Sequence, residues 1–183
     1  MSLISGLRCI KRKDDIVKIR NNSHFFKNKP RLTSSKFHQG IFKPKNPDKY
    51  AGDVNHILYR SGLELKWFKW FDIHPSILQW KCEETVIQYY NPIKQKLSKY
   101  FLDVHIKYQK KTSQIREAII EIKPLEQVKK PVQGKRKTRS YQYTVTQYIV
   151  NEAKWNAAKE VANKNGIEFK ILTETGFVDW SIK

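Results

Sequence analysis

Two acids and a lysine stand inside apolar runs of this 183-residue chain, at positions where a strand pattern favours valine or isoleucine. Asp103 lies in YFLDVHIKY, and Glu121 and Lys123 lie in REAIIEIKP. Aspartate is depleted in strands, and carboxylates are rarely buried without a partner. The positions of these acids therefore call for a cation or for a set of hydrogen-bond donors.

Metal-assisted phosphodiester hydrolysis is the chemistry that uses this combination of side chains. Two carboxylates can hold a Mg²⁺ or Mn²⁺ ion, which acidifies a bound water and neutralises charge that builds on a phosphate. A lysine beside them can orient the attacking water and balance the two acids. The alternative is a salt-bridge cluster on an exposed sheet face, because Glu-x-Lys in a strand also occurs by chance.

Strand alternation predicts which of these side chains share a face. A single strand over residues 99–108 would direct Tyr100 to one face and Asp103 to the other. In residues 117–123, Glu121 and Lys123 share a face. If the two strands pair as a hairpin across KTSQ, Asp103 can lie beside Glu121 and Lys123.

A third carboxylate belongs to the predicted first helix. YRSGLELKWFKWFD has helical spacing, and Glu64 shares a stripe with Phe68 and Phe71. A carboxylate on an inward stripe needs a partner. Either a metal held by Asp103 and Glu121 or a pairing with Arg60, one turn earlier, can fill that role.

Charge identifies the class of partner. The chain has 36 Lys+Arg against 17 Asp+Glu, a formal net charge of +19, and such an excess predicts a polyanion, most often nucleic acid. No apolar run reaches the roughly 18–20 residues that span a bilayer. Cys9 and Cys82 are the two cysteines, and five scattered histidines lack zinc-ligand spacing, so we expect a reducing compartment and no zinc site.

The remaining elements are expected in the order helix, antiparallel strands, long helix, strand, which is an α/β core. The helix at 59–73 is predicted to end before His74-Pro75. Alternation and flanking turns predict strands at 77–83, 85–91, 99–108, 116–124 and 167–174, and a long amphipathic helix at 141–166 that Asn165-Gly166 stops.

Residues 1–49 differ from the rest and are expected to be a basic N-terminal arm before a folded domain at 50–183. They carry 13 Lys+Arg against 3 Asp+Glu without a sustained apolar period. Such a segment is typical of an extended arm that orders on a partner, and a mobile tail is the alternative.

Two further regions are candidates for contacts with DNA. The loop 123–139 carries seven Lys+Arg against one Glu and leaves directly from the Glu-x-Lys strand, so it can grip phosphates near the proposed metal. A polar stripe on the long helix can add contacts, and a solvated linker and a solvent-facing stripe are the alternatives. The candidate DNA-binding residues are Arg60, Lys129, Lys130, Lys135, Arg136, Lys137, Arg139, Gln147, Asn151 and Lys154.

The order helix-Glu, strand-Asp, strand-Glu-x-Lys, helix and strand resembles the PD-(D/E)XK restriction-endonuclease-like superfamily, and its first three elements resemble the TnsA-type transposon endonucleases. The segments YRSGLE, YNP, KYFLD and IEIKP are also similar to those of the head completion nucleases of large contractile-tailed bacteriophages. The resemblance covers roughly residues 40–175. Leu102 stands where the superfamily's name has proline, at a position that varies widely in such folds.

This resemblance implies a restriction-endonuclease-like fold and a Mg²⁺- or Mn²⁺-dependent DNA endonuclease. The centre would be Glu64, Asp103, Glu121 and Lys123, with the three acids as metal ligands. It also implies a role in finishing DNA-filled phage heads, in the host cytoplasm or the head and neck of the virion, with the portal or other head–neck proteins as partners. The alternatives are a structural head-completion protein with a vestigial centre, and a basic DNA-binding module without catalysis.

Overall fold

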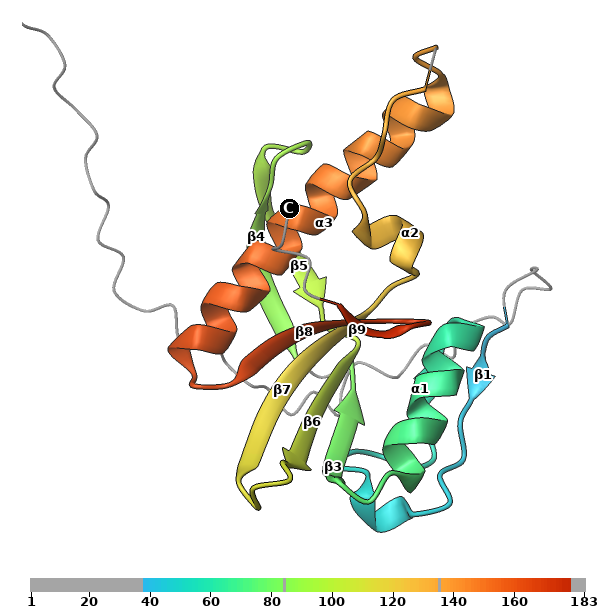
Figure 1. The fold of residues 1–183 in the computed structure, drawn as a ribbon, viewed down its shortest axis with the longest axis vertical. Coiled ribbons are helices and arrows are strands. Elements are labelled where there is room, and N and C mark those ends of the chain that lie inside the picture. The colour runs from blue at the N-terminus through green and yellow to red at the C-terminus, as the bar shows by residue number, and fades with distance from the viewer. Residues whose placement is uncertain (1–37, 84, 135, 179–183) are drawn as a thin grey trace, which may run out of the picture.

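A computed structural model describes residues 38–83, 85–134 and 136–178 of the chain (Figure 1). A helix, a run of strands, a long helix and a further strand follow one another in the order that the sequence pattern predicts. The strands and helices in chain order are β1 (Gly40–Ile41), the short 3₁₀ helix η2 (Pro47–Lys49), β2 (Leu58–Tyr59), α1 (Gly62–Ile73), β3 (Ile77–Cys82), β4 (Val86–Asn91), β5 (Lys96–Phe101), β6 (Val104–Gln109), β7 (Ile115–Ile122), α2 (Leu125–Val128), α3 (Arg139–Lys164), β8 (Glu168–Thr173) and β9 (Gly176–Val178).

The central sheet has five strands in the order β3-β6-β7-β8-β9. β6 and β7 form the antiparallel hairpin that the sequence predicts, with Val104 opposite Ile120. β8 runs parallel to β7, and α3 supplies the crossover between them. The fold is therefore mixed α/β, with one parallel pair in an otherwise antiparallel sheet.

Helices α1 and α3 cover opposite faces of this sheet. Phe68 and Phe71 of α1 pack in one core cluster with Ile120 of β7, whereas Ala158 of α3 packs in another cluster with Ile119. Neighbouring residues of a strand point to opposite faces, so the two helices must lie on opposite sides of β7. Both helices converge on the strand that carries Glu121.

The single strand predicted over residues 99–108 is wrong, because the chain forms two strands that belong to different sheets. β5 pairs only with β4, and β6 pairs with β3 and β7. Leu102 still packs on the α3 side with Ile119, whereas Val104 packs on the α1 side with Ile120. The bend at Asp103 therefore interrupts the alternation of side chains, so that Leu102 and Val104 lie on opposite sides of the sheet.

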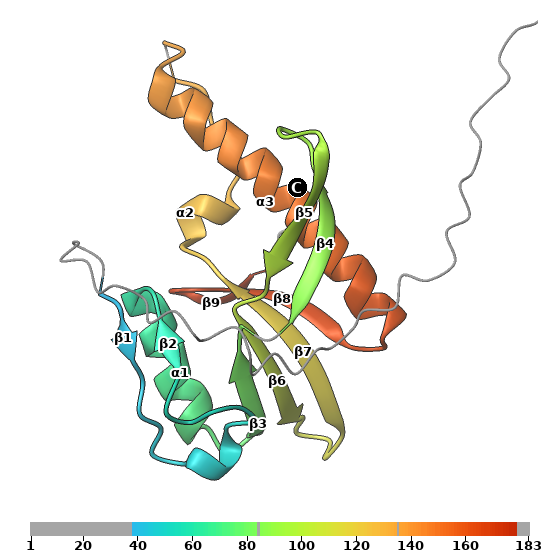
Figure 2. The same ribbon diagram turned by 180° about the vertical axis from the view of Figure 1, so that it is seen from behind.

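Hairpin β4–β5 stands beyond the central sheet and lies along α3 (Figures 1 and 2). Its inner face buries Ile87, Tyr89 and Tyr100 in the cluster that also contains Ala158 and Ala162 of α3. The sequence predicts β4 at 85–91, but it merges β5 with β6 and therefore does not predict that the hairpin is separate from the main sheet.

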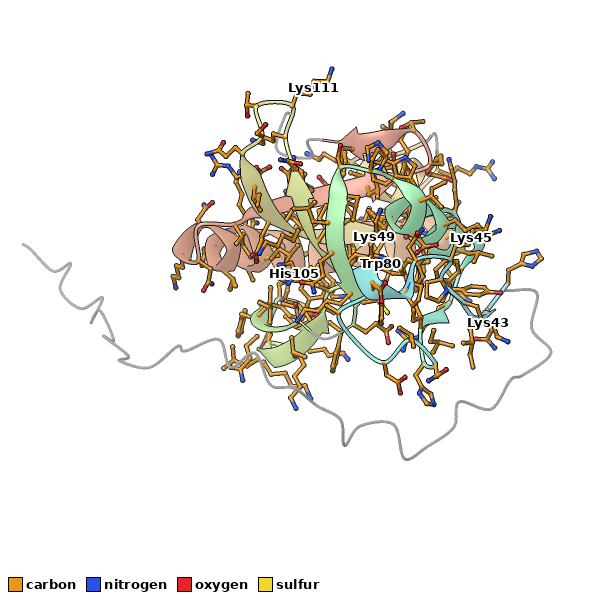
Figure 3. The ribbon with its side chains drawn as sticks, turned by 90° about the horizontal axis from the view of Figure 1, so that it is seen from below. Lys43, Lys45, Lys49, Trp80, His105 and Lys111 are labelled. Carbon is orange, nitrogen blue, oxygen red and sulfur yellow. The ribbon has the colours of Figure 1, made fainter. Side chains whose placement is uncertain are left out.

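The segment before β2 belongs to the folded body. Phe42 and Tyr50 are buried in the α1-side cluster. The buried carboxylate of Asp72 accepts hydrogen bonds from the backbone N–H groups of Lys45 at 2.7 Å and Asn46 at 3.0 Å. The fold therefore includes residues 40–49, which the sequence analysis assigns to the arm. Figure 3 shows the lysines of this segment, Lys43, Lys45 and Lys49, on the side of the molecule that carries Trp80 of β3.

Local signals define the ends of both long helices. The Ser61 side chain accepts a hydrogen bond from the backbone N–H of Glu64, so α1 begins at Gly62 rather than at the predicted 59. α3 ends at Lys164, and Gly166 follows with a positive φ of 65°, as the Asn-Gly signal predicts. The pattern does not predict the short elements α2 and β9.

Candidate active centre

Asp103 and Glu121 lie beside each other where β6 begins and β7 ends. The register pairs Val104 with Ile120, which brings the preceding Asp103 next to Glu121 across the hairpin. The Asp103 carboxylate accepts a hydrogen bond of 2.7 Å from the backbone N–H of Ile122. The hairpin geometry thus brings together the two acids that the sequence analysis selects first.

Lys123 and Tyr100 complete the surroundings of Glu121, whose side chain is buried. The Lys123 ammonium lies 3.0 Å from one carboxylate oxygen, and the Tyr100 hydroxyl donates a hydrogen bond of 2.6 Å to the other. Both oxygens therefore have a partner, which a buried carboxylate requires. Glu121 and Lys123 share a face, as strand alternation predicts.

The electrostatics of the centre reflect two acids in a small space. Burial, followed by the charge of Glu121, raises the pKa of Asp103 well above its ordinary value. Lys123 and the Ile122 N–H oppose this shift, and Glu64 adds to it. Burial lowers the pKa of Lys123, but Glu121 and Asp103 together outweigh it and leave that pKa raised. The Lys123 ammonium is thus held in its charged form by the acids beside it.

Glu64 takes part in the start of α1. Its carboxylate accepts hydrogen bonds from the backbone N–H of Arg60 at 2.8 Å and from the Ser61 hydroxyl at 2.9 Å. The backbone N–H of Glu64 in turn donates to the Ser61 hydroxyl, an arrangement that resembles a capping box except that Glu64 reaches the backbone N–H of Arg60 instead of that of the N-cap residue. Glu64 still contributes to the raised pKa of both Asp103 and Lys123, so its charge acts on the centre from α1.

Arg60 directs its guanidinium to an acid that the sequence analysis does not select. Both terminal nitrogens of Arg60 donate to the two carboxylate oxygens of Glu83, at the end of β3. The backbone N–H of Glu83 donates to the carbonyl of Asp103 at 3.2 Å. Burial raises the pKa of Glu83, and the charge of Arg60 opposes this effect. The pairing of Glu64 with Arg60 is thus made by the Arg60 backbone N–H, while the Arg60 guanidinium pairs with Glu83.

The predicted basic loop leaves the centre through the short helix α2 and reaches the start of α3 (Figure 1). The cations that follow Lys123 in this loop are exposed, and within the described part of the chain none of these later cations forms a salt bridge. Lys135 lies outside the described residues. The members that the structure describes are Lys129, Lys130, Arg136, Lys137 and Arg139.

The polar stripe predicted on α3 points to three different environments. Gln147 is exposed, Asn151 is buried, and Lys154 is half-buried. The Lys154 ammonium lies 5.3 Å from the centre of the Tyr100 ring, within cation–π range. Burial lowers the pKa of Lys154, and Glu121 opposes this effect. Of the three, Lys154 is the one that the structure brings to the centre.

Tyr100 and Glu83 are the residues that sequence reasoning missed. Continuous alternation places Tyr100 on the face opposite Asp103, so the strand break at Asp103 conceals its contact with Glu121. Glu83 ends a predicted strand, and its proximity to Asp103 depends on the pairing of β3 with β6. An acid at the end of a predicted strand is a weak signal of a functional residue, and nothing else in the linear sequence connects Glu83 with Asp103.

The donor set is suited to a hard divalent cation. Mg²⁺ is usually bound by one or two carboxylates and keeps several waters or substrate oxygens. Asp103 and Glu121 offer this number of carboxylates side by side. Within residues 38–83, 85–134 and 136–178 no group of three or more His, Cys, Asp or Glu could hold a metal, so Glu64 does not join the pair as a ready-made third ligand. In the same residues, no helix is long and apolar enough to cross a membrane.

Comparisons with known proteins place the chain among nucleases. A family model described as TnsA-like endonuclease N terminal matches residues 74–174, a span that contains Asp103, Glu121 and Lys123 and begins after Glu64. The head completion nuclease of Enterobacteria phage T4 is 38% identical over 143 residues, which are 76% of this chain and 93% of that protein. A search of solved structures gives no match.

Proposed function

This chain belongs to the TnsA-like endonuclease family, and we propose that it is a metal-dependent DNA endonuclease that acts in phage head completion with little sequence specificity. The observation that carries the proposal is the pairing of β6 with β7, which brings Asp103, Glu121 and Lys123 together. The mixed sheet between two helices is also compatible with a restriction-endonuclease-like core, which we propose as the fold type.

Asp103 and Glu121 would hold the Mg²⁺ or Mn²⁺ ion, and Glu64 would add its negative charge to the metal site from the start of α1. When bound, the ion would supply a more acidic water and would neutralise charge on the phosphate. Tyr100 and the Ile122 N–H fix the two carboxylates by the hydrogen bonds described above. The Lys123 ammonium stabilises the negative charge that develops at the scissile phosphate, because it stays protonated beside the acids.

The basic residues would hold the DNA. Exposed cations contact phosphates without reading sequence, which suits an enzyme with little sequence preference. We assign this role to the set predicted from the sequence, which includes Lys135. Within this set, Arg60 would become available if its guanidinium left Glu83, and Gln147 and Lys154 would extend the contact along α3. Asn151 is buried and does not face the solvent.

The biological role follows from the relative in phage T4, whose name assigns it to head completion. We propose that this chain trims or tidies the ends of packaged DNA before the tail docks. It would act in the host cytoplasm during assembly or at the head and neck of the virion, with the portal or other head–neck proteins as partners. The basic segment at 1–49, net +10, would supply part of those contacts.

A plasmid nicking assay tests the proposed activity. The wild-type protein is expected to convert supercoiled DNA to nicked and linear forms with Mg²⁺ or Mn²⁺ but not in EDTA, and Asp103→Asn is expected to lose the activity. A complementation test separates the structural alternative from the nuclease. Efficient head completion by a cleavage-dead Asp103→Asn protein would mean that cutting is dispensable.

A further inference from the structure

We propose that the outer face of hairpin β4–β5 binds an unpaired DNA strand beside the scissile phosphate. The substrate class would be DNA with a locally unpaired strand, such as a frayed end, a flap or a nick. This inference rests on the proposed nuclease function, and it concerns a surface to which no role has been given so far.

The two faces of the hairpin differ in a way that core packing does not explain. Inward-facing Tyr89 and Tyr100 are buried against α3. On the outward face, Tyr90 is 57% exposed, its cross-strand partner Leu97 is 61% exposed, and Phe101 is 47% exposed. Large apolar side chains thus form an exposed row along the hairpin, which is a common sign of a binding surface.

The charge of the hairpin favours a polyanionic partner. Residues 85–102 contain three lysines and no Asp or Glu. On the outer face, Lys99 stands opposite Gln88, between the pair Tyr90–Leu97 and Phe101. Aromatic rings interleaved with cations are the pattern of single-strand binding surfaces, where bases stack on the rings and the cations contact the backbone.

The hairpin tip is held in a defined shape. The Asn91 side-chain oxygen accepts hydrogen bonds from the backbone N–H groups of Ile93 at 3.0 Å and Lys94 at 2.9 Å. The Asn91 amide donates to the Tyr89 hydroxyl at 3.0 Å. Ile93, at this tip, is 50% exposed. The apolar row is therefore presented by an ordered turn that is already hydrogen-bonded.

The row leads directly to the active centre. Phe101 precedes Asp103 by two residues, and the neighbouring Tyr100 donates its hydroxyl hydrogen bond to Glu121. Figure 2 shows β5 descending from the hairpin tip to the end of the sheet where β6 begins. A strand that follows the outer face past Phe101 would reach the bend that carries Asp103, and we place the scissile phosphate at that end of the row.

An unpaired strand fits this surface better than an intact duplex does. A duplex presents its charged backbone to a protein and keeps the faces of its bases inside the stack. Exposed Tyr90, Leu97 and Phe101 gain little from phosphates, whereas an unpaired base offers them an apolar face on which to stack. The contact would also favour sites where the DNA is already frayed, because unpairing costs least there.

Equilibrium binding to two DNA probes tests the inference. In EDTA, the wild-type chain is titrated against a labelled blunt duplex and against the same duplex with an unpaired fork. We expect tighter binding to the fork, and the double variant Tyr90→Ser/Leu97→Ser should lose about tenfold or more of the fork affinity. Its affinity for the blunt duplex should change by no more than about twofold.

Two controls separate stacking from general damage. Ile115→Ser removes a similarly exposed residue, 52% exposed at the opposite end of β7, and should leave fork binding unchanged. Tyr90→Trp keeps a stacking ring and should retain the fork affinity. Thermal melting identifies any variant that fails to fold, and the single variant Phe101→Ser then carries the test.

Several outcomes would overturn the inference: equal wild-type affinity for fork and duplex, hairpin variants that bind the fork normally, or equal losses on both probes. Normal fork binding by the variants would leave a protein partner or a second copy of the chain as the occupant. Cleavage with Mg²⁺ is measured separately. A wild type that binds the fork but cleaves neither probe contradicts the nuclease function alone. Cleavage that does not depend on the fork, together with hairpin variants that cleave as the wild type does, contradicts the hairpin assignment alone.

Discussion

The active centre and the basic segment 129–139 are adjacent along the chain, and they are built in opposite ways. In the centre, Glu121 is buried, and each of its oxygens has a partner at 3.0 Å or less. The described cations of the basic segment are exposed, and none of them forms a salt bridge with another described residue. Fixed, partly desolvated charges suit the stabilisation of a transition state, whereas exposed cations suit non-specific contact with phosphates. We therefore assign cleavage to the active centre and DNA affinity to the basic segment 129–139.

Removing Lys123 should have the largest effect. Lys123→Ala keeps both carboxylates but removes the ammonium next to the scissile phosphate, so the cleavage rate is expected to fall at least about a hundredfold. DNA affinity should change little, because the exposed cations remain. Cleavage kinetics and a binding titration on one labelled substrate would measure both quantities. Equal losses in rate and affinity would remove the distinction between the two regions.

Neutralising the basic segment should give an intermediate effect on binding. A variant with Lys129, Lys130, Lys135, Arg136, Lys137 and Arg139 changed to glutamine should bind DNA more weakly and with a shallower salt dependence. Each lost duplex phosphate contact lowers the slope of log K against log salt by roughly 0.9. Titrations over a range of salt concentrations would measure the slope. If the slope does not change, the segment is only a linker.

The smallest expected effect concerns stability without metal. The pKa of Asp103 is raised in the folded state, so the native protein binds a proton more tightly than the unfolded chain does. The stability of the wild type should therefore fall as the pH rises from the unfolded value of about 3.9 through the folded pKa. Asp103→Asn cannot ionise, and its amide oxygen can still accept from Ile122.

We expect Asp103→Asn in EDTA to be more stable than the wild type at pH 8 and to differ less from it at pH 5. Urea unfolding at the two pH values would measure the free energy of unfolding. A variant less stable than the wild type at pH 8 would contradict the raised pKa of Asp103 in the metal-free protein.

Local signals in the sequence predict much of this architecture. The common face of Glu121 and Lys123 follows from alternation within one strand, and the end of α3 follows from Asn165-Gly166. Alternation fails at Asp103, because it cannot reveal that a bend transfers the chain from one sheet to another. The contact between Tyr100 and Glu121 depends on that bend.

Long-range pairing explains the other differences. Arg60 and Glu83 meet because the fold places the end of β3 next to the start of α1. No spacing rule connects two positions so far apart in the chain. Residues 40–49 look like part of a basic arm by composition. Their attachment to the core depends on the buried Asp72, which sits among the apolar residues of α1. The sequence pattern thus predicts elements better than the contacts between them.

Single-turnover cleavage at saturating protein tests whether the active centre supplies the chemistry and the basic segment only the binding, because DNA affinity then no longer limits the rate. The wild type, Asp103→Asn and the neutralised basic-segment variant are compared on one labelled substrate with Mg²⁺. The basic-segment variant should recover the wild-type rate once the DNA is saturated, while Asp103→Asn should stay slower by orders of magnitude. An Asp103→Asn protein that cleaves at the wild-type rate, beside a basic-segment variant that stays slow at saturation, would contradict this division of roles.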